Sequence, residues 1–208
     1  MTYLITNKGQ TVTTPYSPAE WQCMEAEGLV RPLIDGVWAA GALRQTADIR
    51  ARAAGLVTPI QLIGRVVIGW SSAAWVHGWA PSPARLELLI DQSSRTTSAH
   101  RITDKVIIHE VKNPLDRSLN MSGTFVSDRV RTAVDVARYC NDDEAAAILS
   151  HAFRDPSLPA QIQAAEELGS LPALTGPTSR ARRRLRKAAQ GAWRPRAGSR
   201  GVKAASGR

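Results

Sequence analysis

In the larger part of the chain, strand-forming runs come first and helical patterns follow, and this order constrains the fold more than any other sequence feature. Apolar runs suited to strands occupy residues 65–69, 86–90, 106–111 and 124–126. Helical patterns then begin at Ser127 or Asp128 and cover residues 142–154 and 160–168. Because the two kinds of element are segregated, we expect an α+β fold with a mixed sheet in this region.

Residues 17–20 carry a clear helix start. Ser17 suits the N-cap, Pro18 the first helical position and Glu20 the returning half of a capping box. We therefore expect a helix over residues 18–27 that ends at Gly28.

Hairpins are expected on both sides of that helix. Strand-forming residues flank a glycine turn within residues 3–13, and the Asp35-Gly36 pair lies between two apolar runs. A helix followed by a hairpin is the back half of a winged helix, whose earlier helices are missing here. The expected order along the chain is a truncated, degenerate winged-helix-like domain (1–44), a helical connector interrupted near Gly55 and Pro59 (45–63), an α+β domain (64–176), and a basic helix with a flexible tail (177–208).

The positive charge of the chain is confined to residues 180–208. The formal net charge is +9, but residues 1–179 carry 16 Lys and Arg against 18 Asp and Glu, whereas residues 180–208 carry 11 basic residues and no acidic one. Such a local field suits phosphates or an acidic protein surface, and a solvated charged end is the alternative. The candidate nucleic-acid contacts are Lys8, Arg31, Arg180, Arg182, Arg183, Arg184, Arg186 and Lys187.

Three stretches of sequence resemble the AbiEi-like antitoxins of actinobacterial toxin–antitoxin pairs. Residues 28–38 are similar to the wing of that family, residues 68–79 to its strand, small-residue helix and His-Gly, and residues 126–138 to its Arg-Thr-x-x-Asp helix. They occur in the order of the family and fall within residues 28–155. The first helices of the family are replaced here by residues 3–13, which weakens the case for DNA binding more than the case for toxin neutralisation.

The resemblance implies an antitoxin with two partners. One is a nucleotidyltransferase-like toxin, and the other is the operator DNA through which such proteins repress their own operon. The helix of the third stretch offers candidate toxin contacts in Arg129, Arg131, Asp135 and Arg138, because its other face is expected to belong to the core. An ordinary surface ion pair between Arg131 and Asp135 is the alternative, because the two residues are one helical turn apart.

Two other functions stay open. The chain has no Gly-x-Ser-x-Gly, Walker A sequence or protein-kinase loop, so a standard enzyme is not expected. An atypical kinase that phosphorylates the toxin could hold ATP and Mg²⁺ with charged residues near strand ends, namely Asp91, Asp104, Lys105, Lys112 and Asp116. These charges are otherwise interpreted as facing water. A nucleic-acid-binding protein without a toxin partner is the third hypothesis.

Composition excludes several further classes. No run approaches the roughly 18 apolar residues that a bilayer span requires, and the first residues lack a charged leader with an apolar core. Cys23 and Cys140 show neither metal-ligand spacing nor a disulfide framework. We therefore expect a cytoplasmic protein with no membrane partner, no bound metal and no cofactor outside the kinase hypothesis.

Overall fold

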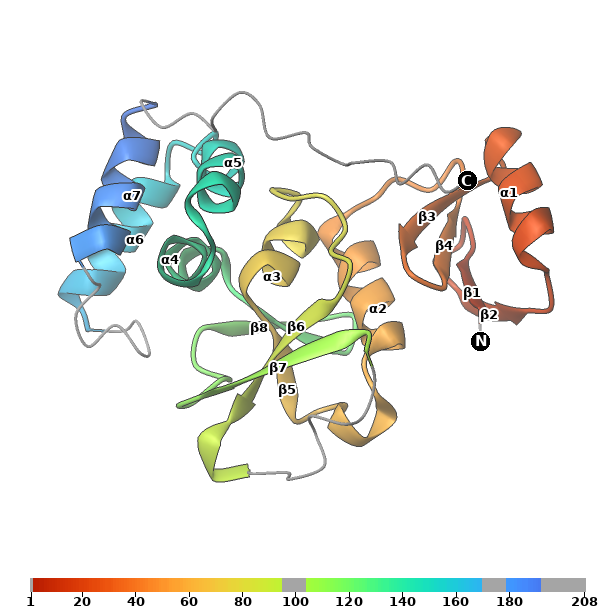
Figure 1. Cartoon of the computed structure of the whole chain (residues 1–208), viewed down its shortest axis with the longest axis horizontal. Coiled ribbons are helices and arrows are strands. Elements are labelled where there is room, and N and C mark those ends of the chain that lie inside the picture. The colour runs from red at the N-terminus through yellow and green to blue at the C-terminus, as the bar shows by residue number, and fades with distance from the viewer. Residues whose placement is uncertain (1, 95–103, 170–178, 192–208) are drawn as a thin grey trace, which may run out of the picture.

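The computed structural model describes residues 2–94, 104–169 and 179–191, and it has the α+β class that the sequence predicts (Figure 1). Two separate β-sheets and a group of helices follow one another along the long axis of the molecule. The tail at residues 192–208 and the boundary near residue 176 lie outside the described residues. No helix in the described ranges combines the length and apolar character needed to cross a membrane.

The first sheet has four strands in the order β2-β1-β4-β3. These are β1 (Thr2–Ile5), β2 (Thr11–Thr14), β3 (Val30–Ile34) and β4 (Val37–Ala40). Both predicted hairpins are confirmed, because β1 pairs antiparallel with β2 and β3 with β4. A parallel pairing of β1 with β4 joins the two hairpins into one sheet.

Helix α1 (Pro18–Ala26) covers one face of this sheet. The capping box is present, with the Ser17 N–H donating to Glu20 Oε2 at 2.7 Å and the Glu20 N–H donating to Ser17 Oγ at 3.3 Å. Trp21 stacks on Trp38 of β4, with ring centroids 4.9 Å apart. Within residues 2–44 α1 is the single helix, so the described N-terminal unit has no helix-turn-helix pair in front of its hairpin.

Helix α2 (Ala47–Val57) packs against both sheets. It contacts β3 and β4 on one side and β8 and β9 on the other, and its Ala51, Ala53 and Ala54 are fully buried in a core that both sheets share. The expected interruption near Gly55 is wrong, because the helix continues to Val57. Its close approach to Thr124 leaves no room for a side chain at this position.

The second sheet has the order β7-β6-β5-β9-β8 and is mixed, as predicted. Its strands are β5 (Val66–Ile68), β6 (Leu86–Asp91), β7 (Val106–Val111), β8 (Ser118–Met121) and β9 (Thr124–Ser127), with the 3₁₀ turns η1 (Ile60–Leu62) and η2 (Gln92–Ser94) before β5 and after β6. Strand β8 was not expected from its polar sequence. It pairs with β9 through a turn in which Ser122 and Gly123 have φ values of 53° and 84°, the left-handed conformation that a two-residue hairpin requires.

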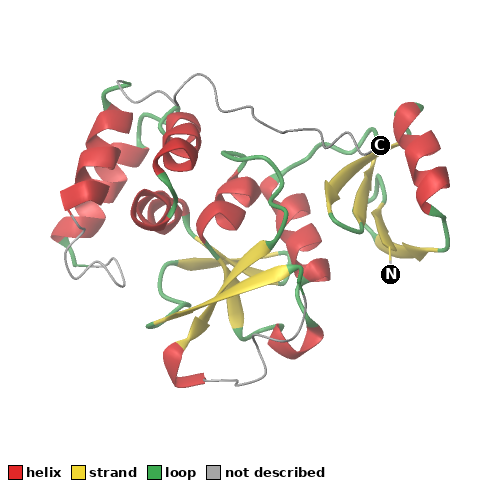
Figure 2. Cartoon of the chain, in the orientation of Figure 1, coloured by secondary structure: helices red, strands yellow, loops and turns green. Residues whose placement is uncertain are grey.

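The remaining helices form a second core (Figure 2). They are α3 (Trp70–His77), α4 (Arg129–Tyr139), α5 (Asp142–Ala152), α6 (Leu158–Glu167) and α7 (Ser179–Ala189). Asp128 caps α4 and Asn141 caps α5. Helix α3 begins at Trp70, and its N-cap residue Gly69 has no side chain that could cap it.

Candidate functional site

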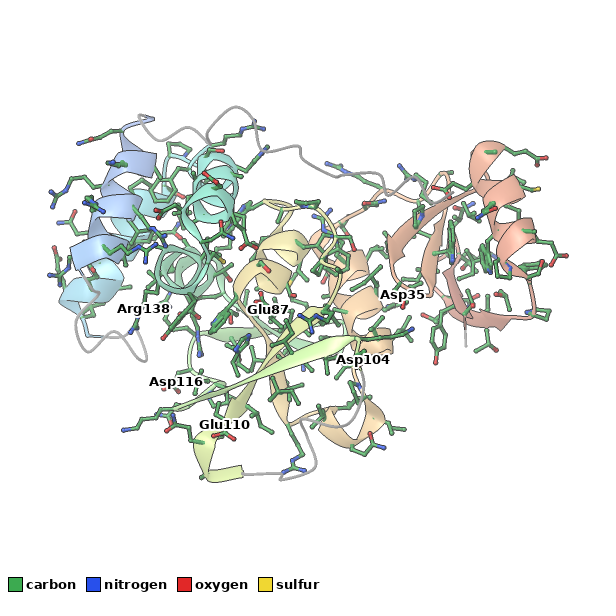
Figure 3. All side chains as sticks on the ribbon, viewed as in Figure 1. Asp35, Glu87, Asp104, Glu110, Asp116 and Arg138 are labelled. Carbon is green, nitrogen blue, oxygen red and sulfur yellow. The ribbon has the colours of Figure 1, made fainter. Side chains whose placement is uncertain are left out.

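The five charged residues considered for a nucleotide site do not come together. Strands β6 and β7 are parallel and in register, with Leu86 opposite Val106 and Asp91 opposite Val111. Asp91, Lys112 and Asp116 therefore follow the carboxyl ends of the strands, whereas Asp104 and Lys105 precede the amino end of β7. Six strand residues at about 3.3 Å each separate the groups by roughly 20 Å. Figure 3 shows Asp104 and Asp116 at opposite ends of β7, so the expectation of one ATP and Mg²⁺ site from these residues is wrong.

Two of these side chains have local structural roles instead. Asp91 accepts hydrogen bonds from the Ser93 hydroxyl, from the Ser93 N–H at 2.8 Å and from the Asn113 N–H at 3.2 Å, which together lower its pKa. Lys105 Nζ lies 2.6 Å from Asp35 Oδ2 and so ties the start of β7 to the β3–β4 turn. In the residues that the structure describes, no group of three His, Cys, Asp or Glu side chains is arranged to hold a metal ion.

Arg131 and Asp135 of α4 form a buried pair, so both the surface-pair alternative and the expectation of a toxin contact at these two residues are wrong. Their exposed fractions are 3% and 6%. Arg131 Nε lies 3.4 Å from Asp135 Oδ2, and Arg131 Nη1 donates to the carbonyl oxygens of Pro114, at 2.6 Å, and Asp116. Neighbouring helices and the loop at residues 113–116 bury residues 130–137 of α4.

Burial also shifts the pKa of Asp135. Loss of hydration opposes ionisation of the carboxyl group more strongly than Arg131 favours it, and the pKa of Asp135 is raised to about 6. The pair therefore holds the 113–116 loop on α4 at an electrostatic cost.

The other two expected toxin contacts on α4 are partly accessible. Arg129 donates to Asp155 Oδ2 at 2.6 Å and lies over the Trp79 ring at 5.5 Å. Arg138 lies over the ring of Tyr139 at 5.1 Å. Both guanidinium groups are half-buried and held by neighbours.

Helix α7 is anchored by one face. Ala181, Leu185 and Ala188, which recur at helical spacing, are buried in the second core. Arg184 is 3% exposed and donates to the carbonyl oxygens of Ala137 and Cys140, both at 2.9 Å. The expectation that Arg184 contacts nucleic acid is therefore wrong, because the side chain is buried and its donors are used by carbonyl oxygens at the C-terminal end of α4 and by the Asp142 carboxylate.

The opposite face of α7 is cationic. Arg182, Arg183, Arg186 and Lys187 are exposed, and we refer to these four residues as the α7 cation face. Arg180 is also exposed, but it pairs with Asp142 at 3.2 Å, and hydrogen bonds from Arg184 and Arg180 lower the pKa of that carboxyl group. Lys8 and Arg31 belong to the first sheet region at the other end of the molecule, so the expected nucleic-acid contacts fall in two distant places (Figure 1).

A polar network that sequence analysis missed fixes the β5–α3 junction. The Ser71 N–H and hydroxyl donate to Glu87 Oε2 at 2.9 and 2.6 Å, so a strand carboxylate caps the first turn of α3. Burial opposes ionisation of Glu87, but the His109 ring 3.7 Å away and the Ser71 bonds outweigh it, and the pKa of Glu87 is lowered. A lone Glu within the apolar run 86–90 was the available signal.

The same junction contains a strained aromatic residue. Trp70 has φ of 48°, and its ring is stacked between His109, at a centroid distance of 3.5 Å, and Tyr139, at 4.5 Å. A positive φ in a bulky residue costs free energy, and the surrounding contacts hold it in place. A cleft of about 440 Å³ lined by Ser71, Glu87 and Glu144 lies beside this junction.

An apolar surface lies at the end of α2. Ile60 and Ile63 are 78% and 54% exposed, and Ile63 borders a pocket of about 190 Å³ with Leu56, Ile68 and Phe125 in its lining. Ile60 is three residues before Ile63 in the sequence, and exposed large apolar side chains beside a pocket are candidates for a protein–protein contact. We refer to Ile60, Ile63 and this pocket as the isoleucine patch.

No protein-family model matches the sequence, and no curated protein matches it. Among solved structures, the chain is similar to the crystal structure of the Rv2827c protein from Mycobacterium tuberculosis, at 16% sequence identity and a TM-score of 0.44. The match covers 87% of this chain and 67% of that one. A likeness at these values supports no transfer of function.

Proposed function

We propose that the chain is an antitoxin that neutralises a nucleotidyltransferase-like toxin by direct contact and has operator DNA as its second partner. The resemblance to AbiEi-like antitoxins motivates this proposal. Its three stretches correspond to the β3–β4 hairpin, the β5–α3 junction and α4, which are framework parts of the two cores.

The isoleucine patch is the observation that carries the toxin half of the proposal. Ile60 is 78% exposed, whereas Leu62, the other apolar residue of the same 3₁₀ turn, is only 1% exposed. Exposure of such side chains beside an open pocket costs solvation free energy that a partner would recover. The predicted α4 surface gives weaker support, because two of its four residues are buried.

Contact is favoured over covalent modification of the toxin. The charged residues on which the kinase hypothesis depended lie at two ends of the sheet, and no other observation favours it. A binding antitoxin needs only a complementary surface.

The experiment compares an Ile60→Asp/Ile63→Asp variant with a Leu168→Asp control. Leu168 is 80% exposed at the end of α6, so the control introduces the same chemistry at a distant exposed apolar site. We expect the double variant to lose toxin affinity by at least about tenfold, as for a central interface residue, and to stop rescuing cells that express the toxin. The control should retain both.

Two results would contradict the proposal. If both variants rescue growth equally, the isoleucine patch is not the toxin surface. If labelled phosphate passes from ATP to the toxin in the presence of the purified chain, neutralisation proceeds by modification rather than contact.

A further inference from the structure

We propose that the α7 cation face binds the phosphate backbone of double-stranded DNA. This inference rests on the proposed function, because operator DNA is the second partner in that function, and it adds the surface that makes the contact. Neither the resemblance nor the N-terminal unit points to this helix.

The first step is that α7 cannot turn to hide its charges. Ala181, Leu185 and Ala188 are buried against α4 and α5, and the guanidinium of Arg184 is bonded to the Ala137 and Cys140 carbonyl oxygens. These contacts fix the rotation of the helix about its axis. The four cations of the outer face are therefore held outward before any partner arrives.

The second step concerns spacing and neutralisation. Arg182 and Arg186 are about one turn apart, and so are Arg183 and Lys187. The two members of each pair are therefore separated by about 6 Å along the helix axis, and the two pairs lie next to each other. Helix α7 contains no acidic residue. Among the described residues, no carboxylate lies within ion-pair distance of Arg183, Arg186 or Lys187, and Arg182 has only Glu166 at 3.7 Å.

The third step decides the class of partner. Protein interfaces have an apolar or aromatic centre, and the outer positions of α7 offer Arg, Lys, Ala189 and Gln190 only. Arginine forks match phosphate oxygens and bind them with high strength. Residues 192–208 add five more Lys and Arg and no Asp or Glu to the sequence. These residues therefore fit a polyanion, a partner that can be bound without an apolar contact.

The fourth step sets the side of approach. A groove between α6 and α7 is lined by Arg182 and Arg186 and also by Glu166 and Glu167. Those carboxylates repel phosphates. The backbone is therefore expected to approach from the Arg183 and Lys187 side, away from α6.

The experiment measures affinity for a short mixed-sequence DNA duplex as a function of salt concentration. The test variant changes Arg182, Arg183, Arg186 and Lys187 to Gln. A matched control changes four exposed cations elsewhere to Gln, namely Arg44, Arg65, Arg85 and Lys112. Both variants lose the same charge, so a difference between them reports on position and not on net charge.

The α7 variant is expected to lose about 0.9 from the slope of log affinity against log salt for each cation that contacts a phosphate, whereas the control keeps most of its slope. Equal losses in the two variants, or an unchanged slope in the α7 variant, would overturn the proposal. Thermal unfolding midpoints equal to that of the wild type show that both variants are folded.

Toxin rescue by the same variants separates this inference from the proposed function. The α7 variant should still rescue cells, while Ile60→Asp/Ile63→Asp should lose rescue and keep its DNA slope. If the α7 variant keeps DNA binding and loses toxin rescue, its cation face is a protein surface and the DNA assignment is wrong.

Discussion

Arg131 connects α4 to the loop that follows β7, because its guanidinium donates to the carbonyl oxygens of Pro114 and Asp116 and pairs with Asp135. Replacing it with Met would leave the buried Pro114 carbonyl group and the buried Asp135 carboxyl group without this donor. We expect Arg131→Met to lower the free energy of unfolding by about 3–5 kcal/mol, measured by urea denaturation. Arg138→Met, at a half-buried position on the same helix, should cost less than about 1 kcal/mol. Similar losses in both variants would contradict a special role for Arg131.

The raised pKa of Asp135 gives a pH dependence with a definite sign. The folded value of about 6 lies above the ordinary 3.8, so folding favours the protonated form. The stabilisation from this group is complete below about pH 4 and is lost as the pH rises through 6. The shift corresponds to about 3 kcal/mol. Wild type should therefore gain stability relative to Asp135→Asn as the pH falls from 7 to 4, and parallel urea-unfolding curves across that range would contradict this.

Among the secondary-structure elements, those specified by nearby residues were predictable from sequence. The capping box at Ser17 and Glu20, the Asp35-Gly36 turn and the Asp128 cap all act within four residues, and each lies where it was expected. Strand β8 was missed because its polar residues show no strand pattern, and it is a strand only through its pairing with β9. The parallel β1–β4 pairing joins segments far apart in sequence and leaves no local pattern.

The candidate interfaces were less predictable, because burial of a charged side chain depends on tertiary neighbours. Helical spacing places Arg131 and Arg184 beside exposed cations, yet both find backbone carbonyl oxygens in other elements. The isoleucine patch presents the opposite case. Ile60 follows Pro59 in an apolar stretch that resembles core sequence, and only the fold shows that nothing in the described chain covers it.

Gly55 tests the packing of α2 against β9. A Cβ at this position would overlap the Thr124 hydroxyl group. Alanine is favoured over glycine in a helix by about 1 kcal/mol, but overpacking costs about 1–3 kcal/mol, so Gly55→Ala should be destabilising on balance. In a Thr124→Ala background the overlap disappears and the same substitution should become stabilising. Chemical denaturation of the four proteins in this cycle measures the coupling, and additive effects would contradict the packing described here.

On the scale of the whole molecule, α3 joins the two cores. Ala73, Trp75 and Val76 of α3 belong to the core shared by the two sheets, whereas Ala74 of the same helix, with Trp79 just beyond its end, belongs to the helical core. Neighbouring side chains of one short helix thus contribute to both. A loss of packing in either core displaces the helix that the other core needs, which favours cooperative unfolding of the described parts.

Leu185→Ala tests this coupling from the end of the molecule most distant from the first sheet. The side chain is 8% exposed in the helical core, and its truncation should destabilise the protein by roughly 2–5 kcal/mol. Trp21 and Trp38 stack in the first sheet region and contribute to tryptophan fluorescence, while far-UV circular dichroism follows mainly the helices. If α3 couples the cores, both signals should give one transition with the same lowered midpoint in the variant. A helical signal that melts before the fluorescence changes would show instead that α4 to α7 unfold on their own, and that the shared residues of α3 do not link the two cores energetically.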